Sequence, residues 1–177
     1  MRQLLTVTAI LVSCIAIAQQ QQNNTGIPIP MKNGIIFYEQ SNPVTNSHKE
    51  ELYKKAVKWF SQSFPDSKGT IKEDKSNWKI SGKGIFKVIT DESAGHYYWL
   101  KPDITITITD DGYTFQSYNY YEKPIMSGVT NDYSKIEYRW WDFRKGKPWN
   151  AEDKALFEGL NQHSLSLMAS LQKEMTK

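Results

Sequence analysis

The chain has 177 residues, of which 39% are hydrophobic and 23% are charged, a balance typical of one compact globular domain. This composition excludes a chain that is disordered throughout. The formal net charge is only +3, which is low for a nucleic-acid-binding protein, and we therefore expect no nucleic-acid partner.

Residues 1–18 have the features of a secretory signal peptide. Arg2 supplies a positive charge, an apolar stretch runs from Leu4 to Ile17, and Ala18 ends a small-x-small cleavage site. The alternative is lipidation at Cys14, the only cysteine, because the residues before it are similar to a bacterial lipobox. Both alternatives predict export, to the periplasm or the exterior. Only lipidation would attach the protein to a membrane.

A polar tether is predicted over residues 19–30, because its first half consists almost entirely of Gln and Asn, which bury little apolar surface. A single folded α+β domain is expected over residues 31–177. Its first strand is predicted over 35–39, after a turn at Asn33-Gly34.

A first helix is predicted to begin at Ser47 and to end at Pro65. Ser47 and Glu50 have the spacing of a capping box, in which each side chain binds the backbone N–H of the other. Leu52, Ala56 and Phe60 recur at four-residue steps, which indicates one buried face.

An antiparallel meander is predicted over residues 70–121, where apolar and polar residues alternate. Two of its strands carry apolar residues at even-numbered positions, which assigns that face to the core. Pro102 cannot donate a backbone hydrogen bond, so we expect a bulge or break there. Gly82 and Gly84 allow strong bending, and the sheet is therefore expected to be curved.

Two further elements are predicted after the meander. Residues 135–144 are assigned to one more strand. A final helix is expected over 150–175, where Asn150 has the position of an N-cap and Asp153 is the third helical residue.

Three segments of this chain resemble a family of exported bacterial proteins that is described as a domain of unknown function with a TATA-box-binding-protein-like fold. They are residues 51–60, 69–88 and 104–113. The similarity extends over about 37–122. It implies a strongly bent antiparallel sheet with helices packed on one face, in agreement with the periodicity. The family carries no assigned catalytic or ligand residues.

No catalytic or cofactor motif is present in the sequence. The three histidines have no His or Cys neighbour at metal-ligand spacing, and the chain lacks a phosphate-binding loop, a nucleophile elbow and a dinucleotide fingerprint. We therefore expect no metal, no cofactor and no enzymatic activity.

The outward face of the sheet is the main candidate site, because lysines there alternate with aromatic residues, which suits a polymer or protein partner in the cell envelope. The predicted binding residues on this face are Lys79, Lys83, Lys87, Tyr97, Trp99, Lys101, Tyr118 and Tyr120. The alternative is a solvated face whose rings are covered by residues 125–149.

Arg139 and Trp141 form a second candidate site. Adjacent Trp residues in a strand point to opposite faces, so one of the pair Trp140-Trp141 could anchor a partner, unless both rings pack against the protein itself. A further alternative is a small-molecule or glycan site in a cavity under residues 126–149.

Overall fold

The computed structural model describes residues 27–45, 47–139 and 149–177, with only the backbone described at 67 and 68. The predicted signal peptide, most of the predicted tether, Cys14 and Trp141 lie outside the described residues.

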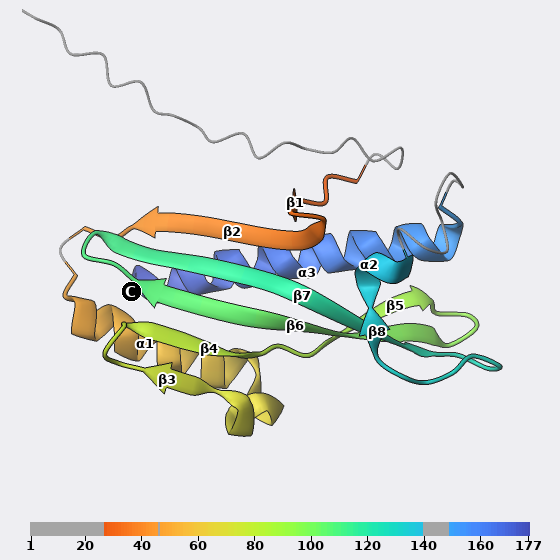
Figure 1. Cartoon of the computed structure of the whole chain (residues 1–177), viewed down its shortest axis with the longest axis horizontal. Coiled ribbons are helices and arrows are strands. Elements are labelled where there is room, and N and C mark those ends of the chain that lie inside the picture. The colour runs from red at the N-terminus through yellow and green to blue at the C-terminus, as the bar shows by residue number, and fades with distance from the viewer. Residues whose placement is uncertain (1–26, 46, 140–148) are drawn as a thin grey trace, which may run out of the picture.

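One antiparallel sheet of eight strands forms the centre of the described structure (Figure 1). The strands are β1 (Met31–Lys32), β2 (Ile35–Pro43), β3 (Lys72–Asp74), β4 (Lys79–Lys83), β5 (Phe86–Asp91), β6 (His96–Ile108), β7 (Gly112–Ile125) and β8 (Ser134–Lys135). The helices are α1 (Lys49–Ser63), the 3-10 helix η1 (Pro65–Thr70), the single turn α2 (Ile136–Tyr138) and α3 (Ala151–Met175).

The two long strands β6 and β7 pair with each other, and each has two short partners in succession along its other side. β4 and β5 follow one another along β6, whereas β2 and β8 follow one another along β7. The even-numbered apolar positions from Trp78 to Thr90 predict one continuous strand, but the observed strand is interrupted at Gly84-Ile85. Its even-numbered positions face the core throughout, as predicted.

A β-bulge lies where these short partners change over. The pairs of β6 and β7 shift from Lys101 opposite Tyr121 to Asp103 opposite Tyr118, so β7 holds one extra residue. Asn119 takes up this residue in the left-handed region, with φ 52°, which Asn tolerates better than most residues. The break predicted at Pro102 is thus confirmed, but the extra residue lies in the neighbouring strand.

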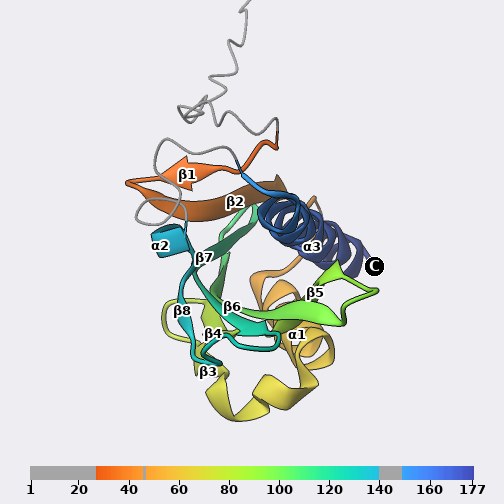
Figure 2. The same ribbon diagram turned by 90° about the vertical axis from the view of Figure 1, so that its right-hand side faces the viewer.

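Helices α1 and α3 both cover one face of the sheet, and Figure 2 shows the sheet curved around this side. The core consists of two clusters, one on each side of the bulge. The first includes Phe60, Ile106 and Leu171, and the second includes Leu100 and Phe157. The predicted α+β class, with a bent antiparallel sheet and helices on one face, is confirmed.

The two long helices begin differently. α3 begins as predicted: Asn150 Oδ1 accepts from the Asp153 N–H at 2.7 Å, and Asp153 Oδ2 accepts from the Asn150 N–H at 3.2 Å. The capping box predicted for α1 is wrong, because His48 is the N-cap residue and makes no side-chain capping bond. Glu50 instead binds Lys75 at 3.2 Å. None of the helices within the described ranges is long and apolar enough to span a membrane.

The ends of the domain differ from the predictions in two places. Ile29 lies within the predicted tether but is buried in the second core cluster. The strand predicted over 135–144 is wrong over its described part, since Lys135 ends β8 and the chain then turns into α2, while 140–144 lie outside the described residues. Ile136 in α2 is buried in the same cluster, which explains why the chain leaves the sheet here.

Candidate binding face

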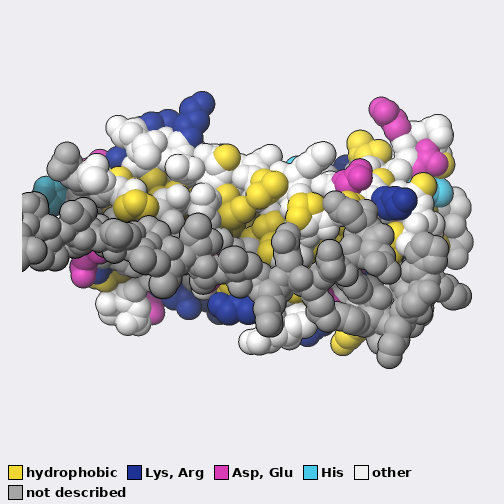
Figure 3. Space-filling model, turned by 90° about the horizontal axis from the view of Figure 1, so that it is seen from above, with side chains coloured by type: hydrophobic (Ala, Val, Ile, Leu, Met, Phe, Trp, Pro, Cys, Tyr) yellow, Lys and Arg dark blue, Asp and Glu magenta, His cyan; other side chains and the backbone are white. Residues whose placement is uncertain are grey.

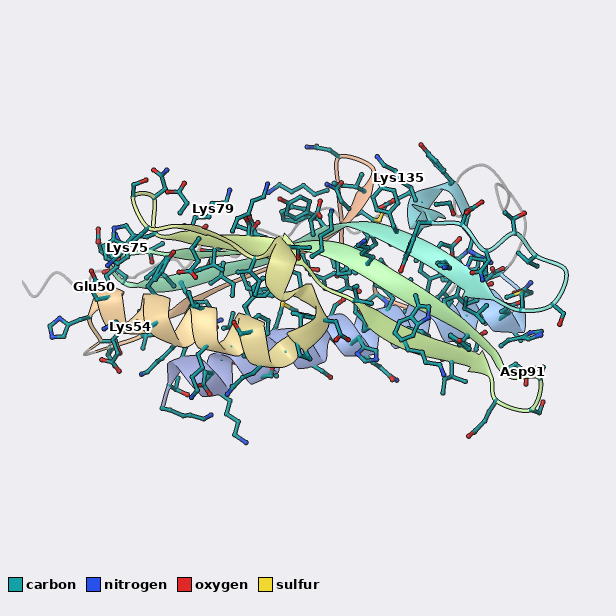
Figure 4. All side chains as sticks on the ribbon, turned by 90° about the horizontal axis from the view of Figure 1, so that it is seen from below. Glu50, Lys54, Lys75, Lys79, Asp91 and Lys135 are labelled. Atoms are coloured by element: carbon teal, nitrogen blue, oxygen red, sulfur yellow. The ribbon has the colours of Figure 1, made fainter. Side chains whose placement is uncertain are left out.

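The candidate site is the face of the sheet opposite α1 and α3. Lys79 and Lys135 lie on this side in Figure 4, pointing away from both helices. Because β-strand side chains alternate between faces, the outward residues of neighbouring strands form rows across the sheet. The bulge at Asn119 divides these rows into two halves with different chemistry.

The half formed by β2, β4 and the adjoining ends of β6 and β7 is nearly neutral. Lys83 Nζ lies 2.5 Å from Asp103 Oδ1, and Asn119 donates to the other oxygen of Asp103 at 3.0 Å. Glu39 accepts from Gln116 at 2.6 Å. The predicted residue Tyr118 stacks on Phe37 with ring centroids 5.7 Å apart. We call this region the neutral half.

The other half of the face is formed by β5, β8 and the ends of β6 and β7 that pair with them. Its rows carry lysines and aromatic rings without acidic residues. Opposite one another lie Lys87, Trp99 and Lys123 in one row, and Lys101, Tyr121 and Lys135 in the next. We define the cationic patch as Lys87, Tyr97, Trp99, Lys101, Tyr121, Lys123, Tyr133 and Lys135.

The lysines of the cationic patch contact its rings. Lys87 Nζ lies 3.9 Å from the centroid of the Tyr97 ring, which meets Trp99 edge to face at 6.1 Å. The Nζ atoms of Lys101 and Lys123 lie 5.3 Å and 5.7 Å from the centroid of the Tyr133 ring. Cation–π contacts of this kind hold lysines over rings without neutralising their charge.

The four lysines of the cationic patch form no ion pair with any residue that the structure describes. Of the rings, Tyr133 is 41% exposed. Beside them, Ile89 is 55% exposed and lies opposite Tyr97. The patch therefore combines unneutralised positive charge with accessible apolar surface.

A different surface is seen from above, where β2 lies beside α3. Hydrophobic side chains gather along the middle of this surface in Figure 3. The cationic patch differs from it because a ring lies between two lysines in each of two adjacent rows.

Tyr120, predicted on the outward face, is buried on the opposite face. Its hydroxyl hydrogen-bonds to Ser117 Oγ at 2.7 Å and to Ser164 Oγ at 2.8 Å, and burial raises its pKa to about 12. The bulge reverses the alternation of β7 after Asn119, which moves Tyr120 to the core and Tyr121 outward.

Arg139, predicted to contact a partner, instead binds within the protein. Its Nε donates to both oxygens of Glu122 at 2.9 and 3.0 Å, and its terminal nitrogens donate to Asp153 at 3.2 Å and to the Tyr98 hydroxyl at 3.0 Å. Tyr98 in turn donates to Glu152 at 2.7 Å. This cluster fixes α2 and the start of α3 to the sheet.

The pKa values in this cluster follow from burial and charge. Burial raises the pKa of Glu122, and Arg139 offsets only part of this effect. Burial alone would lower the pKa of Arg139, but the neighbouring Glu122 carboxylate outweighs it, so the pKa of Arg139 is raised overall. Arg139 is therefore charged and is not available to an external ligand.

Seven of the eight face residues predicted from the sequence lie outward, but they divide between the halves. Lys87, Tyr97, Trp99 and Lys101 belong to the cationic patch, whereas Lys79, Lys83 and Tyr118 lie in the neutral half. Sequence reasoning missed four residues of the patch: Tyr121, Lys123, Tyr133 and Lys135. The only sequence signal for them was the break expected at Pro102.

Residues 126–149 were predicted to cover a cavity, but the described part of this stretch belongs to the sheet and the core. β8 continues the sheet and α2 packs into the core, while 140–148 lie outside the described residues. Across the described parts of the chain, no group of three or more His, Cys, Asp or Glu residues is arranged to hold a metal ion.

Residues 38–122 match the model of a domain of unknown function, DUF4468, with a TBP-like fold. The predicted family resemblance is confirmed. The DUF4468 match ends within β7, so Lys123, Tyr133 and Lys135 lie beyond it. Curated proteins give no match to the chain.

Two solved structures share the fold. A TBP-like protein from Parabacteroides distasonis is 16% identical, with a TM-score of 0.63 over 81% of this chain and 97% of that one. A DUF4468 family protein from Bacteroides ovatus is 12% identical, with a TM-score of 0.69 over 84% of this chain and 91% of that one. At these identities the comparison concerns the fold alone.

Proposed function

We propose that this DUF4468 protein is an exported, non-enzymatic binding module that holds an anionic polymer, or the acidic surface of a protein partner, against the cationic patch. The patch is the part of the predicted basic and aromatic face that keeps its charge. Lys83, by contrast, is neutralised by Asp103, so the neutral half contributes little attraction for an anion.

One observation carries this proposal: the rows Lys87-Trp99-Lys123 and Lys101-Tyr121-Lys135 place a ring between two lysines twice in succession, and none of these lysines is paired with an acidic residue of the described ranges. Positive charges crowded on one surface repel each other and destabilise the fold unless a ligand compensates for them. Rings beside the charges supply apolar contact area, so an anion bound there would gain both attraction and burial.

Export of the protein rests on the predicted signal peptide over residues 1–18. The absence of catalytic motifs from the sequence supports a binding role. The partner would therefore be a component of the cell envelope or its surroundings, held without chemical change.

A pair of matched double variants tests the proposal. Lys101→Gln with Lys123→Gln removes two charges from the patch, whereas Lys54→Gln with Lys173→Gln removes two exposed lysines from the helices on the other face of the sheet and leaves the same net charge. Binding of the purified protein to polyglutamate and to polygalacturonate is measured by titration calorimetry at low and at physiological salt.

We expect at least one polymer to bind, more weakly at the higher salt, and the patch variant to lose about tenfold or more in affinity while the control stays close to the wild type. Failure of both polymers to bind, or an equal loss in both variants, would refute the proposal.

A further inference from the structure

We infer that the ligand of the cationic patch is a carboxylated polysaccharide, a chain of sugar rings in which some units carry a carboxylate. This inference rests on the proposed function and specifies its ligand. It follows from three properties of the face: the pairing of its strands, the arrangement of lysines around rings, and the chemistry of the neutral half beside it.

The two long strands at the centre of the patch offer no free edge for strand addition. β6 pairs with β7 on one side and with β4 and β5 on the other, and β7 pairs with β2 and β8 on its second side, whereas β5 and β8 each pair on one side only within the described residues. A peptide that adds to a sheet needs the free backbone groups of an edge strand. A ligand over the centre of the patch, at Trp99 and Tyr121, is therefore held by outward side chains, and the chemistry of those side chains selects it.

The rows of the patch fit a flat unit with charge at its rim. Trp99 lies between Lys87 and Lys123, and Tyr121 lies between Lys101 and Lys135. The face of a pyranose ring presents C–H groups that pack on an aromatic ring, while a carboxylate at its rim reaches a neighbouring lysine. An acidic peptide offers the charges but no flat apolar unit between them.

The neutral half extends this surface along the same two strands. Its outward side chains on β6 and β7 include Thr107, Thr114 and Gln116, which lie opposite one another or in adjacent rows. These groups donate and accept hydrogen bonds, as sugar hydroxyls do. A polymer charged at every unit would instead meet the carboxylates of Asp103 and Glu39 here.

The same features disfavour a nucleic acid, the other common polymer that combines flat rings with negative charge. The cationic patch contains lysines but no arginine, and the whole chain has a formal net charge of only +3. Every nucleotide carries a phosphate, so a strand that continued past Lys101 would approach Asp103.

The test compares three anionic polymers at equal concentrations of charge: hyaluronate, in which every second sugar carries a carboxylate, polyglutamate and a single-stranded oligothymidylate. Binding to the purified protein is followed by calorimetry, in the wild type and in Trp99→Ala and Trp99→Phe. Thermal unfolding of each variant shows whether it is folded. Trp99→Phe is the matched control, because it keeps a ring at the centre of its row.

We expect hyaluronate to bind at least about tenfold more tightly than either other polymer. We also expect Trp99→Ala to lose about tenfold and Trp99→Phe to lose less than about threefold. Equal or tighter binding of polyglutamate would overturn the inference and leave the proposed function intact. Tighter binding of the oligothymidylate would overturn the inference and the expected class of partner. If no polymer bound, both proposals would fail.

Discussion

Tyr118 and Tyr120 are separated by a single residue in β7, yet their side chains lie on opposite faces of the sheet. Tyr118 stacks on Phe37 at the outward face, and Tyr120 is buried beneath α3, where it hydrogen-bonds to Ser164. Asn119 between them adopts φ 52° and forms the bulge. One residue in an unusual conformation thus decides which aromatic rings serve the core and which serve the surface.

Replacing each of these tyrosines by Phe should separate their roles. Tyr120→Phe removes a buried hydroxyl shared by Ser117 and Ser164, and should lower the free energy of unfolding by about 1–2 kcal/mol. Tyr118→Phe removes a hydroxyl from the outward face and should change it by less than about 0.5 kcal/mol. Urea unfolding of both variants measures the difference, and equal effects would contradict this assignment.

The bulge also shows where the sequence stops being informative. The alternation of apolar residues places Ile80, Leu100 and Ile106 in the core correctly, because period-two patterns hold along any uninterrupted strand. Pro102 indicates an irregularity in β6. The sequence of β6 alone cannot show that β7 takes the extra residue, because this depends on how the two strands pair. The regular alternation therefore assigns Tyr120 to the outward face, although it is buried.

The candidate site was predictable to a similar extent. Lysines and rings in β5 and β6 were identified because their alternation is regular. The neutralisation of Lys83 by Asp103 was not, because it requires the register between β4 and β6. The inward direction of Arg139 depends on Glu122 and Asp153, which are distant in the sequence and meet only in the fold. Tertiary pairing, and not local propensity, sets these positions.

Removal of Arg139 should strongly destabilise the protein. Arg139→Met would leave the buried Glu122 carboxylate without the cation that binds both of its oxygens, at a cost of about 3–5 kcal/mol. The control is Lys154→Met, which also introduces Met but removes an exposed cation of α3. It should lower the free energy of unfolding by less than about 0.5 kcal/mol. Chemical denaturation compares the two. A small effect of Arg139→Met would mean that the cluster does not hold α2 and α3 in place.

Gly112 should tolerate no side chain. It begins β7 with φ 155°, and a Cβ atom there would lie 2.1 Å from the backbone oxygen of Asn42 in β2. Gly112→Ala should therefore destabilise the protein by more than about 1 kcal/mol, since the backbone of the partner strand has to move. Gly69→Ala is the control, because no atom lies within 4 Å of its added Cβ. The prediction fails if thermal unfolding ranks the two variants equally.

The contact between α1 and the end of α3 should depend on pH. Hydrogen bonds from Lys177 and from Lys58, the latter at 2.7 Å, lower the pKa of Glu174 to about 2. A carboxyl group whose pKa is lower in the folded state stabilises the fold above its unfolded pKa, about 4.3. That contribution is lost as the pH falls from there towards about 2.

Comparison with Glu174→Gln isolates this effect from other titrating groups. At neutral pH the wild type should be more stable than the variant, because the amide cannot form the ion pairs with Lys58 and Lys177. The difference should decrease as the pH falls below about 4.3 and disappear near the folded pKa. Urea unfolding at a series of pH values measures it. A difference that stayed constant down to the lowest pH would show that the Glu174 carboxylate does not stabilise this contact through its charge.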